Sequence, residues 1–212
     1  MKRFFLAALG LVASATIALA QVNVVPQVGV TSSYLARQTY SSAFVGLVPV
    51  SGGTDVLCIA GSATKTIRLE SIKIWGTTAT AIQQLPVLLL RRTVADTGGT
   101  PATTTANPGV TTQIASRNTS NGTPTATLIS YTANPTINDS APTYVDSAEM
   151  VMPIVTSSVV AQPVVFDYAK DAVNLMQHPA LVGAAAQFCI NIQSATVSNA
   201  SVWNGSVTWI EE

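Results

Sequence analysis

The sequence has few charged residues. Only 9% of its 212 residues are Asp, Glu, Lys or Arg, with ten acidic and ten basic side chains, whereas roughly a quarter of an ordinary soluble domain is charged. A nucleic-acid-binding surface needs clustered Lys and Arg to displace counterions from phosphates, and this chain has no such cluster, nor a polybasic membrane patch. The composition therefore argues against a nucleic-acid partner and predicts a neutral surface of Ser, Thr, Asn, Gln and Gly.

Residue types that carry catalysis or bind metals are also scarce. The single histidine, His178, precedes Pro179 in apolar sequence and has no Cys or His neighbour at ligand spacing. A Ser-His-Asp hydrolase would have to use His178, and no G-x-S-x-G motif is present. Asp139, Asp146 and Glu149 could supply paired carboxylates by sequence proximity alone, but acidic residues also serve turns. We therefore predict no enzymatic activity, no metal site and no cofactor.

There are two cysteines, each in strand-like sequence. Cys58 lies in DVLCIAG and Cys189 in QFCINIQ. In an oxidising compartment they can form a disulfide that joins an early strand to a late one. The alternative is that each is a small buried hydrophobic residue. The sequence leaves both open, because the separation of the two Cα atoms decides the matter.

The N-terminus has the pattern of a secretory signal. Met1-Lys2-Arg3 is followed by the apolar residues 4–20, which end in Ala18-Leu19-Ala20. A membrane anchor would want about 20 strongly apolar residues, and a retained, buried arm is a third alternative. We predict a signal-like helix over 1–20, an N-terminal arm over 21–39 and one domain over 40–212. Cleavage would make the protein periplasmic, extracellular or surface-exposed, with no stable membrane span.

Short β-prone runs fill the rest of the chain. Runs rich in β-branched residues, separated by Gly, Pro and Asn, predict strands at 41–50, 53–60, 64–75, 85–92, 125–132, 150–155, 162–168, 186–193 and 206–211. Only 169–177 reads as a short helix. In 64–75 the alternation changes phase near Glu70-Ser71, which predicts a β-bulge that keeps all four apolar side chains inward: Ile67, Leu69, Ile72 and Ile74. The prediction is an antiparallel, jelly-roll-like β-sandwich of about eight strands.

The C-terminal sequence VWNGSVTWIEE carries three further predictions. Asn204-Gly205 is a strong hairpin-turn signal. Trp203 and Trp209 could form an aromatic contact surface, although core packing explains aromatic residues more often. Glu211-Glu212 reads as a solvated tail.

The tract that follows the apolar residues 88–90 is unusual. Arg91 and Arg92 mark the predicted point at which the strand leaves the core for water, and residues 93–124 show no strand pattern. A loop of this length is uncommon in a compact domain and tends to be functional. We predict an interaction loop whose charges are Arg91, Arg92, Asp96 and Arg117; a solvated excursion is the alternative.

Several segments resemble one group of proteins. The segments are GSATKTI at 61–67, ADTGGT at 95–100, YTANPT at 131–136 and the terminal VTWIEE. They resemble, in the same order, segments of small virion-associated proteins of tailed bacteriophages. The resemblance covers roughly residues 40–212. It implies a β-sandwich structural protein, of the decoration or minor structural type, with no catalytic residues.

Two functions from different classes follow. The first is a structural subunit that self-associates or binds a larger assembly, such as a virion, through edge strands and the 93–124 loop. The second is an exported bacterial surface or periplasmic binding module that recognises a glycan or a protein. The second predicts cleavage after Ala20, a monomer with exposed aromatic residues and a Cys58–Cys189 bond.

Overall fold

The computed structural model describes residues 37–48, 54–101, 112–131, 134–169, 178–193 and 201–212. The chain divides into two units, Met1–Ala36 and Arg37–Glu212, and the fold described is that of the second. The predicted signal at 1–20, nearly all of the arm at 21–39 and the helix at 169–177, apart from Ala169, lie outside the described residues. Within the described part, no helix is long and apolar enough to cross a membrane.

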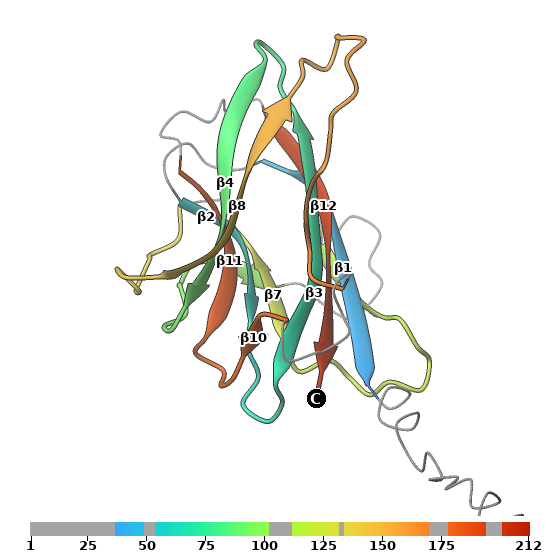
Figure 1. The fold of residues 1–212 in the computed structure, drawn as a ribbon, viewed down its shortest axis with the longest axis vertical. Helices are drawn as coiled ribbons and strands as arrows, with labels where there is room; N and C mark the ends of the chain where they lie inside the picture. Colours follow the sequence, from blue (N-terminus) through green and yellow to red (C-terminus); the bar gives the residue numbers. More distant parts are fainter. Residues whose placement is uncertain (1–36, 49–53, 102–111, 132–133, 170–177, 194–200) are drawn as a thin grey trace, which may run out of the picture. The chain divides into compact units, whose positions relative to one another are not determined.

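Twelve strands form two six-stranded antiparallel sheets over the described residues (Figure 1). Sheet A has the order β10-β3-β12-β1-β6, and β9 also pairs with β3. Its strands are β1 (Gln38–Leu47), β3 (Ile67–Thr77), β6 (Thr112–Ser116), β9 (Val164–Asp167), β10 (Ala180–Leu181) and β12 (Val202–Glu211). Sheet B has the order β5-β7-β2-β11-β4-β8. Its strands are β2 (Thr54–Ala60), β4 (Gln83–Arg92), β5 (Thr100–Pro101), β7 (Thr127–Ser130), β8 (Thr143–Met152) and β11 (Gln187–Ile192).

One apolar core lies between the two sheets. Ile72 and Val207 of sheet A and Leu89 and Ile190 of sheet B are all buried in this core. Burial of apolar side chains contributes about 25 cal/mol per Å² removed from water, so this cluster is the main force that holds the sheets face to face. The predicted all-β fold, in which two antiparallel sheets pack face to face, is confirmed.

The predicted β-bulge in β3 is confirmed. The register with β12 passes from Thr208↔Ser71 to Trp209↔Leu69, which leaves Glu70 as the extra residue. The four apolar side chains of this strand are all buried in the core: Ile67, Leu69, Ile72 and Ile74. The phase change in the sequence therefore marks a real irregularity of the backbone.

The predicted hairpin at Asn204-Gly205 is wrong. β12 runs through this dipeptide without a break, and Gly205 is opposite Phe44 on one side and Ile74 on the other. A Cβ atom at Gly205 would collide with the Lys73 carbonyl oxygen and lie 2.5 Å from the Phe44 ring. The glycine is therefore required by close packing inside the sheet rather than by a turn.

Gly205→Ala should destabilise the protein by about 2–3 kcal/mol, because the added methyl group overpacks a site bounded by backbone. The free energy of unfolding in urea measures this. Gly122→Ala is the matched control, since the nearest atom to its Cβ would lie 3.4 Å away, at the flexible Gln38 side chain. Equal stabilities of the two variants would contradict the assignment.

Candidate functional site

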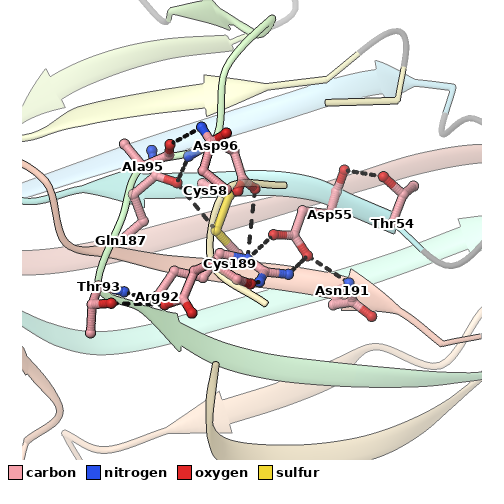
Figure 2. A network of polar contacts seen from close by, with 12 residues as sticks. Thr54, Asp55, Cys58, Arg92, Thr93, Ala95, Asp96, Gln187, Cys189 and Asn191 are labelled. Atoms are coloured by element: carbon pink, nitrogen blue, oxygen red, sulfur yellow. Dashed lines mark hydrogen bonds and ion pairs between the residues drawn. A yellow bond between two sulfur atoms is a disulfide. The ribbon is translucent and has the colours of Figure 1, made fainter. Parts of the chain in front are cut away.

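The face of sheet B that points away from the core carries a buried polar network (Figure 2). Leu57 and Ile59 of β2 belong to the main core, whereas Cys58 between them joins a separate small cluster with Tyr131 and Cys189. Because side chains alternate across a strand, this second cluster lies on the opposite face of the sheet. The charged residues of the network gather around it.

A disulfide lies at the centre of this face. Cys58 on β2 and Cys189 on β11 are directly opposite in register, their Cα atoms are 4.1 Å apart, and their sulfur atoms are bonded. The bond links residues 131 positions apart in the sequence. Of the two alternatives that the sequence left open, the structure contains the disulfide.

Beside the disulfide, Arg92 forms a bidentate ion pair with Asp55. Arg92 Nη2 donates to Asp55 Oδ1 at 2.9 Å, and Arg92 Nε donates to Asp55 Oδ2. Asn191 Nδ2 adds a third hydrogen bond to Asp55 Oδ1 at 2.6 Å. A bulge at Val56 in β2, where the register passes from Ile190↔Leu57 to Asn191↔Asp55, brings Asp55 onto this face.

The prediction that Arg92 marks the exit of its strand into water is therefore wrong. Arg92 is only 3% exposed, while its neighbour Arg91 is exposed. The two side chains point to opposite faces of β4, and Arg92 lies opposite Gln187 of β11. One feature of the sequence could have indicated that Arg92 is buried. In a chain with so few charged residues, each charged side chain is a candidate for an ion pair inside the fold.

Two loop segments cover the network. Arg92 Nη1 donates to the backbone oxygen of Asp139 at 2.8 Å, and Asp139 Oδ2 accepts from the Thr93 amide at 2.7 Å. The Ala141 amide donates to Asp139 Oδ1 at 3.0 Å. These hydrogen bonds, from the Thr93 amide first, hold the pKa of Asp139 below its ordinary value. Residues 93–97 and 136–141 are thus fastened to each other and to the sheet.

Asp96 completes the network from the covering loop. Its amide donates to Gln187 Oε1 at 3.1 Å, and its carboxylate lies 3.7 Å from Arg92 Nε. Among the described residues, no donor makes a hydrogen bond to either carboxylate oxygen of Asp96. Burial, and then the nearby Asp55 carboxylate, raise the pKa of Asp96 to about 7 against the pull of Arg92. Arg92 therefore neutralises Asp55, and Asp96 is partly protonated at neutral pH.

The donor atoms of this network do not fit a metal ion. Ligand atoms of Asp55, Cys58, Asp96 and Cys189 lie within 4.8 Å of one another. Both sulfur atoms are consumed in the disulfide, however, and thiolates rather than disulfides bind metals. Arg92 also occupies both oxygens of Asp55. The site therefore consists of the buried Arg92–Asp55 ion pair beside the Cys58–Cys189 disulfide.

Trp203 and Trp209, predicted as an aromatic contact surface, are both completely buried, so that prediction is wrong. Trp209 stacks on Tyr40 with 5.9 Å between ring centroids, and both rings lie in the core. Trp75 is half-buried instead. The Lys73 ammonium lies 5.7 Å from the centroid of its ring, and both residues line a hollow of about 200 Å³ with Ala161 and Pro163.

The solvated tail predicted at Glu211-Glu212 is wrong for Glu211, which is buried. Its carboxylate accepts hydrogen bonds from the amides of Thr125 and Ala126 and from Trp209 Nε1, at 2.9–3.1 Å. Burial alone would raise the pKa of Glu211, but these donors hold it below its ordinary value. Glu212 is exposed and pairs with Arg68 at 2.7 Å.

The described parts of the tract 93–124, residues 93–101 and 112–124, contain strands that the sequence did not predict. These are the two-residue strand β5 and the strand β6, which pairs with β1 at the edge of sheet A. Arg117 is exposed next to β6, and its amide donates to the Thr39 carbonyl oxygen at 3.0 Å. The structure thus separates the four charges predicted for this loop: Arg92 and Asp96 are internal, whereas Arg91 and Arg117 face solvent.

A second notable surface is the edge strand β8. It is the last strand of sheet B and pairs with β4 on one side. Residues 143–149 are exposed or half-buried, and the half-buried Val145 and Ala148 pack against the main core. Tyr168, half-buried against the same core, donates to Asp146 Oδ2 at 3.2 Å. These side chains form a rim at which the core reaches solvent.

No family model matches the chain, and neither the curated proteins nor the solved structures contain a match to it. The resemblance to bacteriophage proteins therefore stays a prediction from the sequence.

Arg92→Met should cost about 3–5 kcal/mol of folding free energy, because it leaves Asp55 buried beside Asp96 without a cation. Arg91→Met on the neighbouring, exposed residue should change stability by about 0.5 kcal/mol or less. Urea unfolding of both variants at pH 7 measures the difference. Similar losses in the two variants would show that Arg92 is not an internal ion-pair partner.

Asp96→Asn should change how stability depends on pH. A folded-state pKa of about 7, above the unfolded value near 3.8, means that the folded protein holds the proton more tightly. The stability from this group is full below about pH 4 and is lost as pH rises towards 7. Between pH 4 and pH 8 the variant should therefore gain stability relative to the wild type, by up to about 1.4 kcal/mol for each unit by which the folded pKa exceeds the unfolded one.

Urea unfolding at several pH values checks this gain. Glu149→Gln, on the exposed edge strand, is the control and should follow the wild-type curve over the same range. A constant offset between Asp96→Asn and the wild type from pH 4 to pH 8 would rule out the raised pKa.

Proposed function

We propose that this chain is a non-enzymatic structural protein, a subunit that works by protein–protein contact in a larger assembly. The resemblance of its sequence to virion-associated proteins favours a decoration or minor structural role, on a jelly-roll-like sandwich. The observation that carries the proposal is the β8 edge of sheet B. The polar network gives it indirect support, because its charged groups are engaged with one another and covered.

The β8 edge has the features of an acceptor for another strand. It is ten residues long, and over the described residues only β4 pairs with it in a ladder. An edge strand presents backbone N–H and C=O groups that another chain can pair with. Val145 and Ala148 on this strand, with Tyr168 beside it, form a half-buried apolar rim. An added strand would bury that rim as well as satisfy the backbone.

The charges on this edge restrict the partner. Asp146 and Glu149 lie on β8 among exposed residues. Charged side chains on an edge oppose indiscriminate pairing, and like charges opposite each other destabilise a strand pair. The partner strand is therefore uncharged or basic.

Replacing both Val145 and Ala148 by Asp should raise the dissociation constant of self-association about tenfold or more, roughly 1.4 kcal/mol. The added charges would face any strand that covers the rim. Light scattering of the full chain over a concentration series measures this constant. Val160→Asp, at an exposed loop position, is the control and should leave association unchanged. A full chain that stays monomeric throughout, or equal effects of the two changes, would contradict the proposal.

An exported surface or periplasmic binding module is the second candidate, and two observations favour it. The Cys58–Cys189 disulfide belongs to an oxidising compartment. Trp75, with Lys73 above it and the hollow beside it, offers an aromatic face to a glycan or protein ligand. A native mass that begins at Gln21, two hydrogens light, in a monomeric particle would support this candidate over the first.

A further inference from the structure

The N-terminal arm has the pattern of a strand with one apolar face. In residues 22–31, VNVVPQVGVT, valines occupy positions 22, 24, 28 and 30, and the polar residues Asn23, Gln27 and Thr31 occupy the opposite parity. Apart from Val25, Pro26 and Gly29, this alternation favours a half-buried strand. The arm contains no charged residue between positions 21 and 36.

The arm and the β8 edge are matched in length and in charge. Residues 22–31 and β8 are each ten residues long, and β8 has a bulge at Val145, where its register with β4 passes from Leu89↔Asp146 to Leu90↔Tyr144. The uncharged arm meets the acidic edge without repulsion, whereas a second copy of β8 would bring Asp146 and Glu149 against the same carboxylates. Pro26 also fits, because an added strand is itself an edge strand, where proline is tolerated.

The connectivity favours an arm from another copy. The arm leads into β1, which lies in sheet A between β12 and β6. β8 is the edge of the other sheet, and β12 and β3 separate β1 from the side of sheet A that carries β9. Because β1 and β8 lie in different sheets, the arm is not continuous with a neighbour of β8, and we take a second copy as its source.

We propose that residues 22–31 of one copy add as a strand beside β8 of a second copy, with the even-numbered valines over Val145, Ala148 and Tyr168. This inference rests on the proposed assembly function and names its partner as another molecule of the same chain. The contact joins two different surfaces, so it propagates head to tail and either closes into a ring or extends.

The first test changes one face of the arm at a time in the full chain. Val24→Asp with Val28→Asp should raise the dissociation constant of self-association about tenfold or more in light scattering. Asn23→Asp with Gln27→Asp adds the same charge to the other face and should have little effect. Equal effects of the two pairs, or no effect of either, would overturn the inference.

The β8 variants separate this inference from the proposed function. If Val145→Asp with Ala148→Asp weakens association while the arm variants do not, the edge is an interface and the arm is not its occupant. If the β8 variants also leave association unchanged, the proposed function fails as well.

Crosslinking tests which copy supplies the arm. Two differently tagged full chains, one with Val28→Cys and one with Ala148→Cys, are mixed and treated with oxidised glutathione. A covalent dimer that carries both tags is expected, and Gln27→Cys in place of Val28→Cys should give much less of it. No mixed dimer would overturn the inference. So would a chain carrying both cysteines that crosslinks only within itself, because the arm would then bind its own β8.

Discussion

The bidentate ion pair between Arg92 and Asp55 is the interaction on which the outer face of sheet B depends. It joins β4 to β2 across β11, beside the Cys58–Cys189 bond that already links β2 to β11. A buried ion pair offsets its desolvation only when its remaining hydrogen-bonding groups are satisfied. Asn191 and the backbone oxygen of Asp139 supply those partners, so the covering loops must close for the pair to be stable.

The same constraint explains how a chain with few charges uses them. Of the nine acidic residues that the structure describes, four are buried, and each has a role inside the fold: Asp55, Asp96, Asp139 and Glu211. The surface is therefore even less charged than the composition suggests. Contacts made by such a surface depend on shape, apolar side chains and unpaired backbone, which is why the β8 edge and its rim carry the proposed function. The neutral arm at residues 22–31 suits that edge for the same reason.

Features coded by local alternation could be predicted from the sequence, and features set by distant neighbours could not. The two-sheet sandwich and the bulge at Glu70 follow from apolar periodicity. Gly205 has the sequence of a turn, but its position between two strands decides its conformation. Arg92 and Glu211 look like surface charges until Asp55 and Ala126, which lie 37 and 85 residues away in sequence, are brought beside them. β6 escaped prediction because it is a short edge strand with little buried apolar surface, and polar residues hid the first half of β8.

The outer face of sheet B, where loops cover the Arg92 network, differs from the β8 edge, which is free to pair with another strand. Hydrogen–deuterium exchange of the full chain at low and high protein concentration tests this distinction most directly. The amides of Thr93 and Asp96, which donate to Asp139 and Gln187, should be protected equally at both concentrations. Backbone amides in residues 143–149 that do not pair with β4 should exchange quickly in dilute solution and become protected as the concentration rises. Exchange of these β8 amides at the same rate at every concentration would contradict the account.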